Sequence, residues 1–321
     1  MKNMKKPLII LTGPTAVGKT ALSILIAQEI GAEIISADSI QVYKYMNIGS
    51  AKVTQEEMNG VPHFLVDELE PDAEFNVYRF QKMAKTYINE IYSRGHIPML
   101  VGGTGFYIQS VLYDIAFSDS ADTDDYRQQL ETLAKEKGNL FLHEMLRQTD
   151  PVSAAAIHPN NRKRVIRALE YYRQNGTPIS AHNAQERQKT SPYQFHYFVL
   201  TDDRQALYDR INRRVDLMME AGLLDEVKQL RSMGYGRNLV SMQGIGYKEL
   251  FAHLDGEMTL QEAVALIKQE TRHFAKRQLT WFRREKAVDW VDISKFSYDK
   301  EQILHYMLER LQQEKTKGDR Q

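Results

Sequence analysis

Short β-type runs alternate with helical patterns through the first third of the chain. Three runs have the length and apolar content of buried strands, at Leu8–Leu11, Glu33–Ser36 and Pro98–Val101. Helical patterns lie between them, at Ala21–Ile30 and Arg79–Ser93. Because strands that alternate with helices form parallel sheets covered on both faces, the pattern predicts an α/β fold around a parallel sheet.

The pattern changes in the middle of the chain, where mainly helical sequence follows an acidic turn and ends in a polar loop, Gly176–Ser191. After this loop, Phe195–Leu200 is typical of a strand that returns to the sheet. The last residues are polar and predict a frayed end. We therefore expect a catalytic core formed by residues 1–116 and 194–312, a helical insertion over 117–193 and a flexible tail over 313–321.

Composition excludes several classes of protein. The 42 Lys and Arg residues balance 42 Asp and Glu residues, which argues against nucleic-acid binding through overall charge but allows a local basic face. The absence of cysteine excludes disulfides, a thiolate nucleophile and a Cys-based zinc site. No apolar run approaches the roughly 18 residues of a membrane span, and the one after the basic N-terminus is too short for a signal peptide. We therefore expect a cytoplasmic protein with no membrane association.

A phosphate-binding motif follows the first predicted strand. The pattern G-x-x-x-x-G-K-[ST] is formed by Gly13, Pro14, Thr15, Ala16, Val17, Gly18, Lys19 and Thr20. A strand precedes it and an amphipathic helical pattern follows it. In such a loop, backbone N–H groups and a helix N-terminus surround an anion, the lysine adds a point charge and the hydroxyl can hold Mg²⁺. The motif predicts a bound di- or triphosphate but leaves the reaction open.

Polar residues also follow the next two predicted strands. Residues just beyond the carboxyl end of a strand face the ligand crevice of an open α/β sheet, so we expect Asp38 near the phosphates. Its carboxylate could bind Mg²⁺ or accept a proton; the alternative is that it only caps a helix. After the third strand, Gly102 and Gly103 allow a bulky group to approach and Thr104 offers a hydroxyl, although a plain turn also explains the two glycines.

Positive charge is concentrated between Lys268 and Lys286, where seven Lys and Arg residues accompany two Glu residues. If this stretch is helical, one face carries a basic stripe of Arg272, Lys276, Thr280 and Arg283, with Arg277 beside it. The apolar side, which can anchor the helix, carries Ala275, Leu279 and Phe282. Such a stripe suits RNA phosphates, although a merely solvated face is the alternative. A second basic cluster follows a predicted N-cap at Asn161 and comprises Arg162, Lys163, Arg164 and Arg167.

Several motifs, taken together and in order, resemble one family. They are Gly13–Thr20, Asp38–Tyr43, Gly102–Tyr107, His158–Asn161, Arg164–Glu170, Arg210–Met218, Gly222–Leu223, Gln243–Glu249 and Thr271–Arg283. Over about Pro7–Trp290 the chain resembles the bacterial tRNA dimethylallyltransferase (isopentenyl-tRNA transferase) family. The resemblance implies a P-loop NTPase-like core with a helical insertion that grips tRNA. It also implies transfer of a dimethylallyl group from dimethylallyl diphosphate to N6 of adenosine 37, beside the anticodon.

The resemblance further implies roles for single residues. The P-loop would bind the isoprenoid diphosphate rather than drive ATP hydrolysis, with Mg²⁺ at Thr20 and Arg214 as a second clamp. Because charge builds on the departing diphosphate, we predict that Lys19, Thr20 and Arg214 are catalytic and that Asp38 accepts the proton of the adenine amine. We expect the protein to act as a monomer. The residues expected to contact tRNA are Asp38, Ser39, Ile40, Gln41, Thr104, Arg127, Lys163, Arg164, Arg167, Gln243, Gly246, Lys248, Arg272, Lys276, Arg277 and Arg283.

Other functions share parts of this pattern. A P-loop kinase of a small molecule would use Asp38 as its base and Arg214 as a lid arginine, but it needs neither the basic stripe nor the insertion. A non-enzymatic P-loop switch that binds RNA would have no use for Asp38 beside the phosphates. Prenyl transfer to free AMP shares the P-loop chemistry and differs only in the acceptor. The sequence does not specify which tRNAs or flanking bases are preferred.

Overall fold

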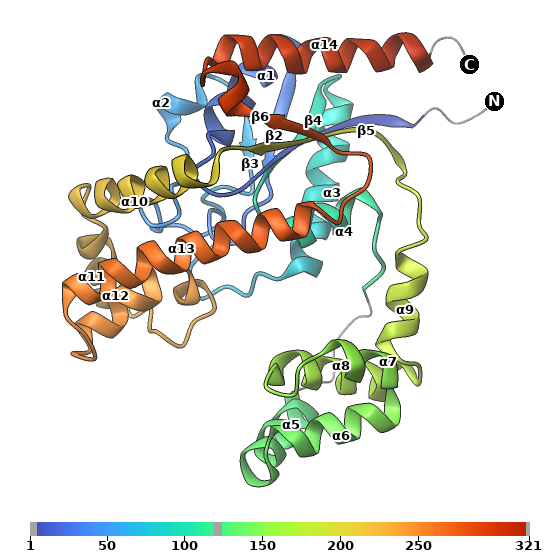
Figure 1. Ribbon diagram of the computed structural model, residues 1–321, viewed down its shortest axis with the longest axis vertical. Helices are drawn as coiled ribbons and strands as arrows, with labels where there is room; N and C mark the ends of the chain where they lie inside the picture. The colour runs from blue at the N-terminus through green and yellow to red at the C-terminus, as the bar shows by residue number, and fades with distance from the viewer. Residues whose placement is uncertain (1–4, 118–123, 319–321) are drawn as a thin grey trace. The chain divides into compact units, whose positions relative to one another are not determined.

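The computed structural model describes residues 5–117 and 124–318 and divides into two compact units (Figure 1). The core unit comprises Met1–Leu112 and Pro192–Gln321, and the insertion unit comprises Tyr113–Ser191. The sequence pattern placed the insertion at 117–193, so the division lies slightly earlier at both ends. Each unit has a buried apolar cluster of its own.

The core unit is built on a six-stranded sheet in which every strand pairs in parallel, so the predicted fold class is confirmed. The strand order is β3-β2-β4-β1-β5-β6. The strands are β1 (Lys6–Thr12), β2 (Ala32–Ser36), β3 (His63–Phe64), β4 (Ile97–Gly102), β5 (Tyr193–Thr201) and β6 (Asp289–Asp292). The four strands expected from the sequence are all present. The sequence analysis missed β3 and β6, which are short edge strands.

The strand registers bring three loops to one edge of the sheet. β1 lies between β4 and β5, and its last residue, Thr12, stands opposite Gly102 and Val199. β2 pairs with β4 so that Ser36 stands opposite Val101. Thr12 Oγ1 also donates a hydrogen bond to Gly102 O at 2.6 Å, which ties two strands together at this edge. The loops that leave β1, β2 and β4 therefore meet, as the crevice of an open α/β sheet requires.

Helices cover both faces of this sheet (Figure 1). α1 (Lys19–Ile30) and α14 (Lys300–Gly318) lie on one face, and α3 (Val77–Ser93) and α4 (Gly105–Leu112) lie on the other. The prediction that α1 is amphipathic is wrong. Ile24 lies on the opposite side of the helix from Leu22 and Ile26, yet all three are buried, because α1 is covered by more than the sheet alone.

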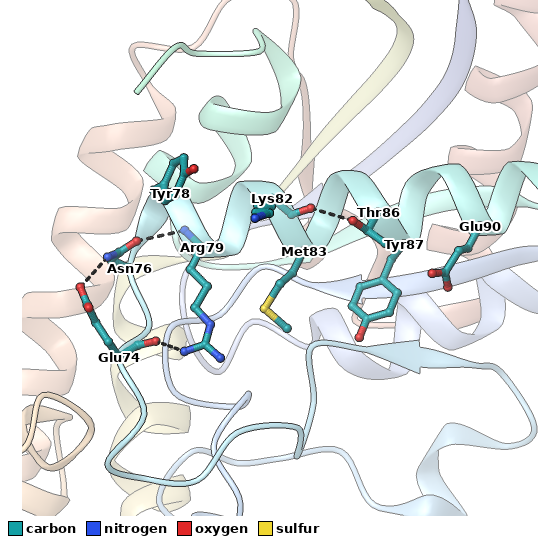
Figure 2. Close-up of a pocket in the computed structure, with 9 residues that line it drawn as sticks. All are labelled: Glu74, Asn76, Tyr78, Arg79, Lys82, Met83, Thr86, Tyr87 and Glu90. Carbon is teal, nitrogen blue, oxygen red and sulfur yellow. Dashed lines mark hydrogen bonds between the residues drawn. The ribbon is translucent and has the colours of Figure 1, made fainter. Parts of the chain in front are cut away.

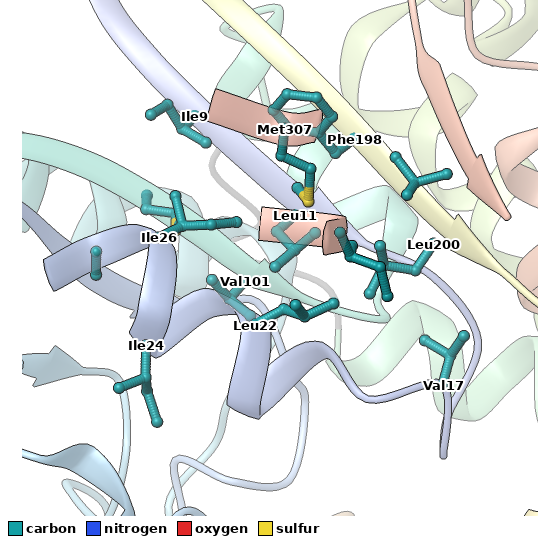
Figure 3. Packing of buried hydrophobic residues seen from close by; sticks show 14 of the residues in the cluster. Ile9, Leu11, Val17, Leu22, Ile24, Ile26, Val101, Phe198, Leu200 and Met307 are labelled. Carbon is teal, nitrogen blue, oxygen red and sulfur yellow. The ribbon is translucent and has the colours of Figure 1, made fainter. Parts of the chain in front are cut away.

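A continuous apolar cluster joins the sheet to α1 and α14 (Figure 3). Alternate residues of each strand point to this face, where they meet the two helices. Full burial of each large side chain contributes about 1.5–3 kcal/mol. The members labelled in the figure are Ile9, Leu11, Val17, Leu22, Ile24, Ile26, Val101, Phe198, Leu200 and Met307. This packing fixes the strand ends from which the crevice loops emerge.

The remainder of the core unit is a layer of helices, α10 (Arg204–Glu220), α11 (Leu223–Ser232), α12 (Tyr247–Leu254) and α13 (Leu260–Phe282). α13 packs against α10 and α12, and α11 contacts both of these helices. α13 begins in a capping box, in which Thr259 and Glu262 each satisfy the other's backbone N–H. Short helical segments are α2 (Gln55–Met58), η1 (Ser241–Gln243) and η2 (Ile293–Phe296).

The insertion unit is helical, with α5 (Asp124–Lys137), α6 (Asn139–Thr149), α7 (Pro151–Ala156), α8 (Arg162–Asn175) and α9 (Ile179–Glu186). Its core includes Leu130, Leu142, Leu146, Val165 and Leu169. The buried Asp150 carboxylate accepts bonds from the backbone N–H and the hydroxyl of both Ser153 and Ser180, and so ties α7 to α9. Asn161 stands at the N-cap of α8, as predicted, but its side chain makes no capping hydrogen bond.

The C-terminal tail differs from the prediction. α14 continues through Gly318, so residues 313–318 are helical, and the last three predicted tail residues lie outside the described residues. Gln, Glu and Lys are polar but are good helix formers, so polarity alone was a poor signal for fraying here. No helix within residues 5–117 and 124–318 combines the length and the apolar character that crossing a membrane requires.

Candidate active site

The three loops at the carboxyl edge of the sheet enclose a cleft of about 470 Å³. α10 and α13 complete its walls through Arg210, Arg214, Phe274 and Gln278. The sequence-predicted residues that line it are Thr15, Ala16, Gly18, Lys19, Thr20, Asp38, Gln41 and Arg214. Segments that are far apart in the sequence thus bring the predicted phosphate loop, the predicted proton acceptor and the predicted second clamp into one cleft.

The phosphate loop has the backbone conformation of an anion nest. Gly13 has φ 147°, and a Cβ at this position would stand 2.6 Å from the carbonyl oxygen of Leu200 on β5, so no other residue fits. Ala16 and Gly18 have φ values of 66° and 99°, in the left-handed region. Residues that alternate in this way turn successive N–H groups toward one concavity, which favours an anion.

Lys19 places a cation at the centre of this loop. Its Nζ donates hydrogen bonds to Gly13 O at 3.1 Å and to Pro14 O at 2.8 Å. The pKa of Lys19 is lowered to about 7: burial is the largest cause, the charge of Arg214 acts in the same direction, and Asp38 partly offsets both. A lysine that loses charge so readily gains most from an anion beside it.

Arg214 lies on α10 and faces the same cleft. Burial lowers the pKa of its guanidinium below the ordinary value, and the negative charges of Asp38 and Glu57 act in the opposite direction. Two half-buried cations in one cleft, both destabilised by desolvation, indicate a site for a polyanion such as a diphosphate.

Asp38 caps the turn that follows β2. Its Oδ1 accepts hydrogen bonds from the N–H groups of Ile40 at 2.8 Å and Gln41 at 3.3 Å. The capping interpretation therefore holds for a turn rather than for a helix, and the turn uses Oδ1 alone. Ser39 and Ile40, which we predicted to contact tRNA, are half-buried in this turn.

The glycines at and just after the end of β4 allow other parts of the protein to approach closely. A Cβ on Gly102 would stand 2.2 Å from Ala37 O, and one on Gly103 would stand 2.1 Å from the side-chain nitrogen of Gln278. A Cβ on Gly105 would stand 2.2 Å from Trp281. The two glycines were predicted to allow a bulky group to approach. In the structure, the groups that approach them belong to α13 and to the turn around Asp38. Gly102 and Gly103 still line the cleft.

Gln278 is a residue of the cleft that the sequence analysis did not single out. Its Oε1 accepts from the N–H of Thr15 at 2.9 Å, and its Nε2 donates to Gly103 O at 3.0 Å. The side chain is 5% exposed, so it bridges the phosphate loop and the β4 loop from inside the protein. A glutamine on the apolar side of a predicted basic helix, three residues after Ala275, was the available signal.

The basic stripe lies on α13, as expected, and is anchored by the buried Ala275 and Phe282. Lys276, Arg277 and Arg283 are exposed. The half-buried Arg272 donates from Nη1 to the Oδ1 of Asn212 on α10 at 2.6 Å, so it also joins two helices. The stripe thus offers exposed cations on a helix whose Gln278 reaches the phosphate loop.

Three further predicted tRNA contacts lie near the start of α12, and none of them lines the cleft. The exposed Gln243 donates from Nε2 to Arg237 O at 2.6 Å. Gly246 is buried, and its N–H donates to the Glu249 side chain. Lys248 Nζ lies 3.3 Å from that same carboxylate. Thr104, a fourth predicted contact, is half-buried in the β4 loop, where its N–H donates to Ala37 O at 3.2 Å.

The second basic cluster lies in the insertion unit. Lys163 and Arg164 are exposed on α8, and Arg167 is half-buried. Arg127 on α5 makes two hydrogen bonds to the carboxylate of Glu170, at 2.8 and 2.7 Å, and this carboxylate is fully buried. Such a pair joins α5 to α8, so the structure gives Arg127 a structural role that the sequence did not predict.

The donor set of the cleft fits a magnesium ion. In phosphate-binding sites, Mg²⁺ is held by one or two protein oxygens together with phosphate oxygens and waters. The Thr20 hydroxyl and the Asp38 carboxylate both line the cleft beside the phosphate loop. Within the described ranges, 5–117 and 124–318, no cluster of three His, Cys, Asp or Glu side chains could hold an ion by itself.

A second hollow runs along α3 and is larger, at about 670 Å³ (Figure 2). Its lining residues all come from α3 and the loop before it, so no loop from the sheet edge reaches it. Several of its polar groups bond within the protein: Arg79 donates to Glu74 O at 2.5 Å, Thr86 donates to Lys82 O at 3.1 Å, and the Tyr87 hydroxyl donates to Glu68 at 2.8 Å. The smaller cleft, with its convergent cations, is the better candidate for catalysis.

The chain is similar to known proteins along almost its whole length. Residues 41–285 match a family model described as IPP transferase, and residues 6–73 match one described as isopentenyl transferase. A tRNA dimethylallyltransferase of Lachnoclostridium phytofermentans is 58% identical over 294 residues, which cover 92% of this chain and 94% of that protein.

Solved structures of related enzymes are also similar to this chain. The full-length tRNA isopentenylpyrophosphate transferase of Bacillus halodurans is 45% identical, with a TM-score of 0.73 and coverage of 99% of this chain and 100% of that one. A eukaryotic dimethylallyltransferase acting on tRNA is 31% identical, with a TM-score of 0.77 and coverage of 89% of this chain and 74% of that one.

Proposed function

The chain belongs to the IPP transferase family of tRNA dimethylallyltransferases, and from this premise we propose how its cleft works. The reaction is transfer of a dimethylallyl group to N6 of adenosine 37 in tRNA. The C1–O bond of dimethylallyl diphosphate breaks, a bond from N6 to C1 forms, diphosphate leaves and one N6 proton is released. One observation carries the proposal: Lys19, Arg214 and Asp38 line a single cleft beside the helix that bears the basic stripe.

The diphosphate binds in the phosphate loop. The dimethylallyl cation is stabilised by resonance, so cleavage is limited mainly by the negative charge that builds on the departing oxygen. Backbone N–H groups of the loop, together with Lys19 and Arg214, stabilise that charge where it develops. The Thr20 hydroxyl would hold a magnesium ion, which would supply further positive charge to the leaving group.

Asp38 accepts the proton from N6. The amine lone pair is delocalised into the adenine ring, so the amine is a poor nucleophile until its proton is removed. The turn holds Oδ1 through the N–H groups of Ile40 and Gln41, and this fixes the carboxylate beside the phosphate loop. General-base assistance of this kind contributes about 10²- to 10⁴-fold in rate.

The tRNA contributes its anticodon arm. Adenosine 37 is stacked in the anticodon loop, so the base has to turn out before its amine can reach the cleft, where Gln41 and Gly103 form part of the wall. Exposed cations of α13 contact the RNA phosphates, and Lys163 and Arg164 of the insertion unit bind the same arm. The protein acts as a monomer in the cytoplasm, where it meets its tRNA substrates.

The test is incubation with labelled dimethylallyl diphosphate and an unmodified anticodon stem-loop, followed by nucleoside analysis. We expect label on the adenosine at position 37, and none on the same RNA with guanosine there. AMP serves as the competing acceptor across a salt series. Efficient prenylation of AMP that does not change with salt would contradict the assignment of RNA as acceptor.

A further inference from the structure

A carboxylate outside the cleft organises one of its walls. Glu226 on α11 is 9% exposed, and both of its oxygens accept hydrogen bonds from the backbone of segment 46–51. Oε2 accepts from the N–H of Asn47 at 2.8 Å and of Ile48 at 2.7 Å, and Oε1 accepts from the N–H of Gly49 at 3.1 Å. Three successive amides on one anion hold this segment in a single conformation.

Tyr247, the first residue of α12, completes the arrangement. Its hydroxyl donates to Glu226 Oε1 at 2.7 Å, and burial together with Glu226 raises the pKa of Tyr247 well above its ordinary value, so the hydroxyl remains a donor. Its ring lies against Gly49, where a Cβ would stand 2.5 Å from the ring carbon Cζ. Within the Gln243–Glu249 motif, Tyr247 therefore has a buried structural role, which a direct contact with tRNA does not explain.

The segment that Glu226 holds in turn holds Gln41. Gln41 Nε2 donates to the carbonyl oxygens of Ser50 at 3.3 Å and Ala51 at 3.2 Å, and its Oε1 accepts from Ser36 Oγ at 2.9 Å. Both Gln41 and Ser50 line the cleft. Glu226 thus reaches the part of the cleft wall formed by Gln41 and Ser50 through a continuous set of hydrogen bonds.

We propose that Glu226 is a positioning residue for the RNA-facing wall of the cleft, acting through segment 46–51 on Gln41. The inference rests on the proposed function, because it assigns Gln41 to the pocket that receives the adenine. A displacement of about 1 Å at such a wall costs roughly 100-fold in rate. Lys19 and Arg214 belong to other elements, so binding of the diphosphate is expected to be independent of Glu226.

The test replaces the carboxylate by an amide of the same shape. In Glu226→Gln, the amide nitrogen faces backbone N–H groups that need an acceptor. We expect kcat/KM for the anticodon stem-loop to fall roughly 10- to 100-fold and hydrogen exchange at the amides of 47–49 to speed up about tenfold or more. The Kd for inorganic pyrophosphate should stay within about twofold. The matched control is Asp225→Asn, a neighbouring carboxylate on α11 whose side chain is 78% exposed, and it should change none of these.

A double-mutant cycle separates positioning from general support of the fold. If Glu226 acts through Gln41, the losses in kcat/KM from Glu226→Gln and Gln41→Ala should not multiply in the double variant. Tyr247→Phe removes one bond to the same carboxylate and should show a smaller loss of the same kind. Should Glu226→Gln fail to fold, Tyr247→Phe carries the same cycle with Gln41→Ala.

Two results would overturn the role of Glu226. One is faster exchange at 47–49 with unchanged kcat/KM for RNA, and the other is full multiplicativity with Gln41→Ala. A wild-type protein that prenylates no RNA, while its 47–49 amides are protected, would instead contradict the proposed function. The two failures are therefore distinguishable.

Discussion

The two walls of the cleft are built in different ways. On the wall proposed to bind the diphosphate, here called the diphosphate wall, the single segment 13–20 supplies the nest, the lysine and the hydroxyl. On the RNA-facing wall, Gln41 is held by segment 46–51, which is held in turn by Glu226, a residue far away in the sequence. A wall made by one loop leaves a motif in the sequence, whereas a wall assembled by distant partners does not.

The difference also separates the expected consequences of mutation. In the proposed mechanism, charges on the diphosphate wall act on the leaving group, so their loss should affect chemistry more than RNA binding. In the same proposal, exposed cations on α13 act on RNA phosphates, so their loss should affect RNA binding more than chemistry. The following changes test whether the two walls separate in this way.

Removing the cation of the phosphate loop should have the largest effect. Lys19→Ala is expected to lower kcat/KM by about 10²- to 10³-fold or more, because the charge on the departing diphosphate loses a buried partner. Single-turnover kinetics and pyrophosphate binding measure the loss, and tRNA binding should be nearly unchanged. Lys44→Ala, which removes a half-buried lysine that is paired with Glu70 and does not line the cleft, is the control. An unchanged affinity for pyrophosphate in Lys19→Ala would mean that the loop does not hold the diphosphate.

Removing the proton acceptor should have the next largest effect. Asp38→Asn is expected to lower kcat about 10²-fold or more while the affinities for both substrates remain broadly intact. The amide can still accept at Oδ1, so the turn that bonds Ile40 and Gln41 should persist. Rapid-quench measurement of the chemical step is the readout. Near-normal turnover would assign Asp38 to the turn alone.

Removing single charges from the basic stripe should have a moderate effect, confined to the binding of RNA. Lys276→Ala and Arg283→Ala are each expected to raise KM for tRNA several-fold and to make the log–log salt dependence of binding shallower by up to about one unit. Arg231→Ala, an α11 cation that pairs with Asp255, should leave the slope unchanged. If all three variants kept the slope of the wild type, the stripe would be only a solvated helix face.

Proton uptake should be the smallest effect and the sharpest test of the diphosphate wall. Lys19 has a pKa lowered to about 7, and a bound diphosphate raises it again. Between about pH 7 and 9, binding of pyrophosphate should therefore take up as much as about one proton, and affinity should fall as pH rises. Calorimetry in buffers of different ionisation enthalpy measures the uptake. Lys19→Arg, which keeps its charge, should lose that component; an uptake equal to that of the wild type would exclude Lys19 as its source.

The fold and the diphosphate wall were largely predictable because their signals are local. Apolar strands that alternate with helices indicated the parallel sheet, and the spacing of the glycines indicated the loop around Lys19. Placing Asp38 in the cleft needed one further rule, that the carboxyl ends of parallel strands meet at one edge. Arg214 came from the family resemblance, since a single arginine on a helix carries no such signal.

The remaining features depend on which residues meet in space. No periodicity indicates that Gln278 bridges Thr15 and Gly103, or that Glu226 holds three amides of a loop far from it in sequence. The pairing of Arg127 with Glu170 is of the same kind. Such pairs are fixed by helix packing, so a helix pattern alone cannot give them.

The place of β1 between β4 and β5 also has a consequence for how the chain is made. β4 leaves the ribosome before the insertion unit, so it can cover one side of β1 early, whereas β5 follows the whole of the insertion. During that interval the second side of β1 has unpaired N–H and C=O groups, which invite pairing with another chain. The insertion unit, with its own apolar cluster, can fold during the same interval. Its length therefore sets how long the nascent protein depends on protection from aggregation.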